Sequence, residues 1–472
     1  MEAILEKLND LVWGMPALAG ILGVGLYLTI RTGFVQIRLF PEALGRFVRM
    51  IRGGDKSSYR SFCTALGATV GTGNLVGVAG AMALGGPGSI FWMWVCGFFG
   101  MATKYAEAVL AVHYRVKAHG EILGGPMYII SRGLGKSWIW LAYVYCFFGV
   151  IAALGVGNAT QINAMVTGLR KIAGWEGTRG NLLLGIGLSM LVALLLRGGA
   201  GGIGAAAEKL VPAAAVGYIG LCILVLILRY DRIGRAFLLI FQGAFDPKAV
   251  TGGFLGSAFS ALRVGCARGV FTNEAGMGTA GIAHGAAQVD HPAQQGMMGI
   301  LEVFFDTLVI CTLTALVILC SGIPIPYGSA CGGELTSGAF CAVLGNWAEI
   351  FLSGCICCFA LATVLGWSLY GLRCARFLLG RGSEKWFVFL QAAVAFLGVV
   401  LETGIIWTAA EIFNGLMAIP NLITLFLLSG EAAGLTRAYI RQKDVGQDVQ
   451  IRAGRNRKIP GNVSCTFEIP EL

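Results

Sequence analysis

The sequence predicts an all-α membrane protein that crosses the bilayer several times. Of its 472 residues, 56% are hydrophobic and only 13% are charged, whereas about a quarter are charged in an average soluble protein. Residues 61–103 contain no charged side chain, and they are long enough for two membrane helices of about 20 residues each. The apolar runs do not alternate and are mostly longer than the roughly ten-residue strands of a membrane barrel. A helix bundle is therefore the expected fold.

Eleven apolar runs are candidates for membrane helices. We expect them at residues 11–31, 61–84, 89–112, 138–168, 182–197, 207–228, 253–283, 298–320, 346–372, 387–401 and 405–429. When the first run is set apart, ten remain in two groups of five, 61–228 and 253–429. Because five is odd, the two groups insert with opposite topology. Each group begins with an interrupted helix, which is typical of transporters built from inverted repeats.

Three further regions surround these groups. Residues 1–60 hold the extra helix and a basic loop, residues 229–252 connect the groups, and residues 430–472 form a basic tail that we expect to be flexible. Of the Lys and Arg residues, 24 lie on one side of the expected helices and 8 on the other. Because cytoplasmic loops carry the basic excess, the sequence predicts a multi-pass cell-membrane protein with an external N-terminus, an external 229–252 connection and a cytoplasmic C-terminus.

The first interrupted helix contains the segment from Ala68 to Asn74, in which two Thr and one Asn accompany two Gly. Glycine and threonine weaken a helix, and an unwound segment inside a membrane frees backbone groups that must meet water or a ligand. The half-helix that begins near Gly73 directs its amide groups at an anion such as a carboxylate. The preceding carbonyl groups could hold a cation. Close packing of helices through small residues is the alternative.

The second interrupted helix contains Asn273, Glu274 and Gly276. A glutamate in an apolar run costs several kcal/mol unless it is paired or hydrated, so Glu274 is a functional candidate. Its carboxylate could hold the ammonium group of a ligand or bridge to a neighbouring helix. An ion pair with Arg268 is the structural alternative.

Two more polar patches lie at helical spacing. Asn158 and Gln161 share one face of the fourth run, and Thr363 and Trp367 share one face of the ninth. Together they would supply the amide, hydroxyl and indole groups of a small ligand pocket. Hydrogen bonds between helices, or for Trp367 a place in an interfacial tryptophan belt, would also explain them.

The remaining charged residues in the apolar runs are expected to be structural. Lys104 and Glu107 have the spacing of a pair on one helix, and Glu302 and Asp306 lie one turn apart, where they could be hydrated or relay protons. His284 is expected in a loop or helix cap. No metal-ligand spacing, nucleophile triad or nucleotide-binding loop is found. We therefore expect no enzyme activity, no cofactor and no nucleic-acid partner.

Long motifs make the chain resemble the alanine or glycine:cation symporter family, the sodium:alanine symporters. These motifs are Gly25–Thr32, Ala68–Asn74, Gly85–Trp94, Ala102–Ala108, Gly124–Tyr128, Ala267–Gly276, Asp290–Pro292 and Asn414–Asn421. The resemblance runs nearly end to end. It implies a LeuT-like core, a 5+5 inverted repeat after one extra N-terminal helix. It also implies sodium-driven uptake of alanine, glycine or a similar small neutral amino acid by alternating access.

The resemblance also implies where the ligands bind. The implied substrate contacts are Thr72, Gly73, Asn74, Gln161, Phe271, Asn273, Gly276, Thr363 and Trp367. The implied sodium site lies between the first interrupted helix and the ninth run, at Thr69, Val70 and Thr363.

One departure from the family pattern concerns the coupling ion. Where the family is expected to have Ser-Thr ahead of the Gly-Trp pair, this chain has Ala362-Thr363 and so lacks one hydroxyl. Sodium-coupled symport is the expected function. A proton-coupled or uncoupled amino-acid facilitator on the same fold is the alternative.

Overall fold

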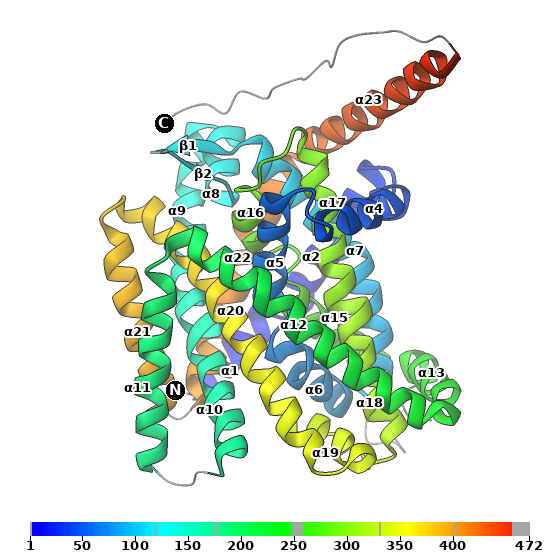
Figure 1. Cartoon of the computed structure of the whole chain (residues 1–472), viewed down its shortest axis with the longest axis vertical. Coiled ribbons are helices and arrows are strands. Elements are labelled where there is room, and N and C mark those ends of the chain that lie inside the picture. The colour runs from blue at the N-terminus through cyan, green and yellow to red at the C-terminus, as the bar shows by residue number, and fades with distance from the viewer. Residues whose placement is uncertain are drawn as a thin grey trace.

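The structure, a computed structural model, describes residues 2–455 apart from 119, 175–177, 247, 249–257, 330–331 and 401–402. Nearly all of the described chain is helical, and the long helices form an upright bundle (Figure 1). The N-terminal region contains α1 (Glu2–Val12), α2 (Met15–Arg31), α3 (Val35–Arg38) and α4 (Phe40–Ile51).

The first expected group of five spans many short elements as well as long helices. In order they are α5 (Lys56–Thr69), η1 (Thr72–Asn74), α6 (Val76–Gly85), α7 (Gly88–His113), β1 (Val116–Ala118), β2 (Glu121–Leu123), α8 (Pro126–Ile129), η2 (Ile130–Leu134), η3 (Lys136–Trp138), α9 (Ile139–Leu154), η4 (Gly155–Ala159), α10 (Thr160–Ala173), α11 (Thr178–Leu196) and α12 (Gly199–Leu228). Strands β1 and β2 form an antiparallel hairpin in which Lys117 pairs with Ile122.

The second group follows the connecting helix α13 (Tyr230–Phe245). Its elements are α15 (Ala258–Asn273), α16 (Thr279–His284), α17 (Pro292–Val303), η5 (Phe304–Cys311), α18 (Thr312–Ser321), α19 (Gly333–Leu344), α20 (Trp347–Leu379), α21 (Ser383–Val400), α22 (Thr403–Leu427) and the tail helix α23 (Ser429–Arg455).

These helices overlap every one of the eleven expected ranges. Within the described residues, five helices are long and apolar enough to cross a membrane, and two bent pairs raise that number to seven. The expectation of a multi-pass helical membrane protein is thereby confirmed. The number of eleven crossings and the division into two inverted repeats stay predictions.

The expected basic tail is helical over residues 430–455, which form most of α23. This helix is anchored to the bundle because Tyr105 of α7 donates a hydrogen bond to Thr436 at 3.0 Å. Lys443 also lies 2.6 Å from Glu42 of α4. Figure 1 shows α23 leaving the end of the bundle that carries the β hairpin, with α13 and α19 at the opposite end.

Helix α7 lies at the centre of the core. In its most apolar 18-residue window, 83% of the residues are buried, and α15 and α17 pack along it. Charged groups on α7 therefore face other helices rather than lipid, and they contribute to the polar groups described next.

Candidate substrate and cation site

The first interrupted helix breaks between α5 and α6, which are bent by 55° relative to each other. Gly71 at the break has an extended backbone. Asn74 stabilises the break from within, because its Oδ1 accepts the Gly71 amide at 2.9 Å. The Asn74 Nδ2 donates to Asp306 Oδ1 of η5 at 2.7 Å. The first amides of the new helical turn, those of Thr72 and Gly73, have no preceding helical carbonyl to bond.

Gln161 and Thr363 approach this break from two other helices. Thr72 donates its hydroxyl to Gln161 Oε1 of α10 at 3.2 Å, and Thr363 of α20 donates to the Gly67 carbonyl at 3.1 Å. A Cβ at Gly71 would lie 2.6 Å from Thr363 Oγ1 and 3.7 Å from Gln161 Oε1. The structure therefore brings Thr72, Gln161 and Thr363 together around a position that only glycine fits.

The same region carries oxygen donors suited to a small hard cation. Helix α5 ends here, so its last carbonyl groups, up to that of Val70, lack helical amide partners. Thr363 adds a hydroxyl, and carbonyl and hydroxyl oxygens are ligands that hard cations take. Thr69 is two residues from Gly67 and hence on the opposite side of α5, where its hydroxyl donates to a carbonyl of its own helix at 3.1 Å. Val70 and Thr363 thus offer a carbonyl and a hydroxyl oxygen here, while Ala362 offers no side-chain oxygen.

The second interrupted helix turns at Glu274, whose φ of 55° is unusual for a residue other than glycine. Both carboxylate oxygens are bonded within the protein: Oε2 accepts the Thr279 hydroxyl at 2.6 Å and Oε1 accepts the Trp367 indole N–H at 2.8 Å. Glu274 therefore ties the α15–α16 turn to α20. The alternative of an ion pair with Arg268 is wrong, because Arg268 instead lies 3.5 Å from Glu411.

Glu107 of α7 supports the rest of this turn. Its Oε1 accepts the amides of Gly276 and Gly278 at 2.9 and 3.0 Å, and the side-chain amide of Asn421 at 2.8 Å. Both glycines have positive φ values, 97° and 77°. The expectation that Glu107 pairs with Lys104 is therefore wrong. The backbone amides exposed at the second break instead donate hydrogen bonds to this carboxylate of the protein. The signal for this role was present, since Glu107 is a charged residue in an apolar run.

Lys104 of α7 instead belongs to a buried polar chain that reaches α17 and α16. Its Nζ lies 2.8 Å from Glu302, which in turn lies 3.0 Å from His284. Gln295 completes the chain at 2.6 Å from the other His284 ring nitrogen. His284 is thus a buried residue of α16 rather than a loop residue. No group of three or more His, Cys, Asp or Glu side chains in the described part of the chain is placed to hold a metal ion.

Two of the predicted amides are committed to helix packing. Asn158 donates to the backbone carbonyl of Gln391 at 2.7 Å, which favours the structural explanation for Asn158. Asn273 donates to the Thr307 hydroxyl at 3.1 Å, and its Oδ1 accepts the amide of Ala275 at 3.0 Å. Asn273 therefore shapes the second break much as Asn74 shapes the first.

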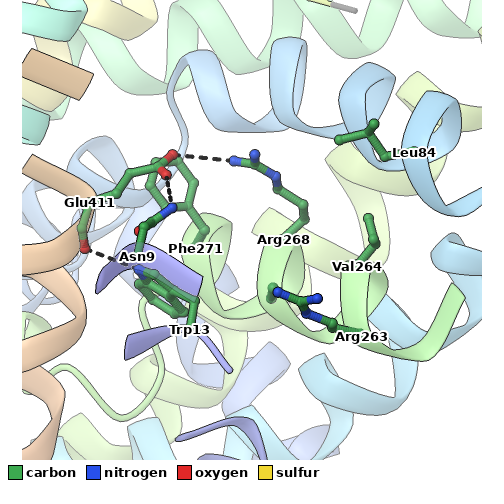
Figure 2. A pocket seen from close by; sticks show the side chains of 9 residues that line it. Asn9, Trp13, Leu84, Arg263, Val264, Arg268, Phe271 and Glu411 are labelled. Carbon is green, nitrogen blue, oxygen red and sulfur yellow. Dashed lines mark hydrogen bonds and ion pairs between the residues drawn. The ribbon is translucent and has the colours of Figure 1, made fainter. Parts of the chain in front are cut away.

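A cavity of about 220 Å³ lies next to Phe271, between α1, α6, α15 and α22. Figure 2 shows Arg268 and Glu411 facing each other across it. The Arg268 guanidinium also lies 5.7 Å from the centre of the Phe271 ring, and two hydrogen bonds from the N-terminal segment hold Glu411. A Cβ at Gly73 would lie 3.6 Å from the same ring. Phe271 therefore contacts both the cavity and the first break.

Comparisons with known proteins show which family the chain belongs to. The family model described as the sodium:alanine symporter family matches residues 1–453. The chain is 41% identical over 449 residues to the sodium/alanine symporter AgcS of Methanococcus maripaludis, covering 93% of this chain and 97% of that protein. It is 36% identical over 464 residues to the probable sodium/glutamine symporter GlnT of Bacillus subtilis, covering 95% and 93%.

Among solved structures, the chain is similar to MhsT in complex with L-phenylalanine, with a TM-score of 0.54 and 13% identity over 80% of this chain and 97% of that one. This likeness shows the fold, which is LeuT-like, as the sequence resemblance implies. The expected family and the expectation of a transporter rather than an enzyme are both confirmed. The chain belongs to the sodium:alanine symporter family.

Proposed function

We propose that the protein couples sodium influx to the uptake of a small neutral amino acid, alanine or glycine. The observation that carries this proposal is the meeting of Thr72, Gln161 and Thr363 around the unwound backbone at Gly71. Three helices converge there on backbone groups that would be hydrogen-bonded if the helix were continuous. Such a place in a membrane protein suits a small polar solute better than lipid or bulk solvent.

The amino-acid carboxylate would bind the first amides of the η1–α6 segment, those of Thr72 and Gly73. A helix N-terminus favours an anion through these amides and through its dipole. Gln161 would add a side-chain amide. The pocket is expected to be small because Trp367 is held in place: a Cβ at Gly157 would lie only 2.2 Å from the Cβ of Trp367. We therefore favour alanine and glycine over glutamine.

The sodium ion would bind between the end of α5 and Thr363, close to the carboxylate site. When bound, it would supply a positive charge that favours binding of the amino-acid carboxylate. The missing hydroxyl at Ala362 supports the second candidate, a proton-coupled or uncoupled facilitator. A site with one ligand fewer holds sodium less tightly.

Alternating access would come from movement of the two interrupted helices against the rest of the bundle. The cavity next to Phe271 would lie on the external side, because the excess of basic residues at the other end favours a cytoplasmic location for that end. Phe271 and the Arg268–Glu411 pair would then separate the first break from the outside. An external N-terminus and a cytoplasmic C-terminus are part of this proposal.

Uptake into proteoliposomes tests the function. Purified protein is reconstituted, and uptake of labelled alanine is followed with an inward sodium gradient, with a proton gradient alone and with no gradient. Accumulation above equilibrium only with sodium is the expected result, with unlabelled glycine competing better than unlabelled glutamine. Equilibration without a gradient would support the uncoupled facilitator. Accumulation driven by a proton gradient alone would identify the proton, rather than sodium, as the coupling ion.

A further inference from the structure

The cytoplasmic end of α20 carries a second polar cluster that the transport site does not use. Arg373 and Arg376 lie 2.7 and 2.6 Å from Glu121 of the β hairpin. Arg376 also lies 3.2 Å from Glu384 at the start of α21. Partial burial raises the pKa of Glu121, but hydrogen bonds and charge from Arg373 and Arg376 outweigh it and hold that pKa below its usual range. Glu121 is therefore ionised at neutral pH and already paired.

A cavity of about 420 Å³ opens beside this cluster, between the α11–α12 turn and the α20–α21 turn. Its lining adds two exposed cations, Arg197 and Lys385. Within the described part of the chain, neither side chain forms a hydrogen bond or ion pair. With Arg373, the lining holds three cations against the carboxylates of Glu121 and Glu384, so the cavity carries an excess of one positive charge.

Exposed apolar side chains continue from this cavity along the outer face of the bundle. Trp386 and Phe389, which follow Lys385 on α21, are 76% and 66% exposed. Leu194, three residues before Arg197 on α11, is 63% exposed. Helices α11 and α21 pack side by side at one edge of the molecule (Figure 1). Tryptophan next to a basic residue at a helix end is typical of the level of the lipid headgroups.

We propose that this cavity binds the phosphodiester headgroup of an anionic phospholipid such as phosphatidylglycerol. Arg197 and Lys385 would pair with the phosphate, and the acyl chains would lie along Leu194, Trp386 and Phe389. Basic pockets between membrane helices on the cytoplasmic side are suited to anionic headgroups. A free phosphate ion would use the cations but would leave the apolar face without a partner, which is why the lipid is favoured.

The location gives such a lipid a direct connection to transport. Arg373 lies on the same continuous helix α20 as Thr363 and Trp367, ten and six residues away. A headgroup that bridges the α11–α12 turn and the start of α21, beside the end of α20, would restrict the motion of α20. This consequence rests on the proposed function, but the lipid site itself does not.

Native mass spectrometry of the purified protein in detergent, titrated with phosphatidylglycerol or phosphatidylcholine, tests the site. The double variant Arg197→Gln/Lys385→Gln should bind phosphatidylglycerol about 30-fold more weakly, since each cation near an anionic lipid contributes roughly a fivefold factor. The matched control, Arg437→Gln/Arg441→Gln on the exposed face of α23, removes the same charge and should bind as the wild type does. Phosphatidylcholine should bind weakly to all three.

Three outcomes would overturn the proposal. The first is phosphatidylglycerol binding that is unchanged in the Arg197/Lys385 variant, and the second is equal weakening in the α23 control. The third is displacement of phosphatidylglycerol by inorganic phosphate, which would make the cavity a site for free anions. A monodisperse elution profile of each variant excludes misfolding, and none of these readouts requires transport.

Discussion

The two interrupted helices solve the same backbone problem with different chemistry. At the first, uncharged side chains, Gln161 and Thr363, approach from neighbouring helices, and the amides of Thr72 and Gly73 have no helical partner. At the second, Glu107 accepts the Gly276 and Gly278 amides. The exposed amides of an unwound helix can therefore bind a ligand or stabilise the fold. They stabilise the fold where the protein itself supplies the anion that accepts their hydrogen bonds.

This difference is why the proposed function puts the substrate carboxylate at the first break. At the second, a carboxylate ligand would have to displace Glu107 from the Gly276 and Gly278 amides. The predictions below test whether one break is a ligand site and the other a structural support, beginning with the largest expected effect.

Replacing Glu107 should lower stability more than any of the other substitutions. Glu107→Ala leaves two buried backbone amides without their acceptor, and each unsatisfied group costs about 1–3 kcal/mol. The Asn421 side chain loses one of its two acceptors and keeps the Gly276 carbonyl. We expect a strongly lowered melting temperature of the purified protein. Glu107→Gln keeps one acceptor oxygen and should lose far less. Equal melting of the wild type and Glu107→Ala would contradict a structural role for the second break.

Gln161→Ala should abolish alanine uptake, and it should lower stability only by the loss of buried hydrogen bonds, about 1–3 kcal/mol, because Gln161 also donates to the Val156 carbonyl at 3.2 Å. The side chain faces the first break, where its only bond to that segment comes from Thr72. Asn158→Ala, three residues away, is the matched control, because Asn158 bonds to Gln391 instead. It should lower the melting temperature by the loss of a buried hydrogen bond, about 1–3 kcal/mol, and retain uptake. If Gln161→Ala transported normally, the ligand site would have to be moved elsewhere.

Trp367→Phe should lower the free energy of unfolding by an intermediate amount. The ring remains buried, but Glu274 loses the indole donor at 2.8 Å, which costs about 1–3 kcal/mol. Because the two residues interact directly, the effects of Trp367→Phe and Glu274→Gln should not add in the double variant. Denaturant-dependent unfolding of the four proteins measures this coupling. Simple additivity would mean that the bond contributes nothing to the second break.

Ala362→Ser should produce the smallest change, and in the favourable direction. It restores a hydroxyl next to Thr363, and one added neutral ligand of about 1 kcal/mol corresponds to roughly a fivefold lower sodium KM for uptake. Ala360→Ser, a buried alanine on the same helix two residues away, is the control and should leave the sodium KM unchanged. A sodium KM that is unaltered by Ala362→Ser would mean that the cation does not bind next to this part of α20.

Much of the fold could be predicted because lipid imposes long apolar runs, and the two breaks could be predicted because glycine and polar residues interrupt those runs. Helical spacing also predicted that Gln161 and Thr363 lie on helix faces that carry other polar or aromatic candidates for the ligand site. The partners of Glu107 and Lys104 could not be predicted, because they lie far away in the sequence: Asn421 is 314 residues from Glu107. The cost of burying a charge shows that a partner must exist, but it does not say which helix supplies it.

The helices between and after the membrane runs were also missed. Helix α13 lies in the expected 229–252 connection, and α23 in the expected flexible tail. Both are too polar to register as membrane helices, and α23 is stabilised by tertiary contacts such as that between Lys443 and Glu42. Local composition indicates charge and solvation there, whereas the packing surface that orders the helix comes from other parts of the chain.

A structure of the protein with alanine and sodium bound tests the central distinction between the two breaks most directly. The predicted result is density for the alanine carboxylate at the Thr72 and Gly73 amides, beside Gln161 and Thr363, with Glu107 still bonded to Gly276 and Gly278. Alanine bound at the Gly276 and Gly278 amides, with Glu107 displaced, would contradict it.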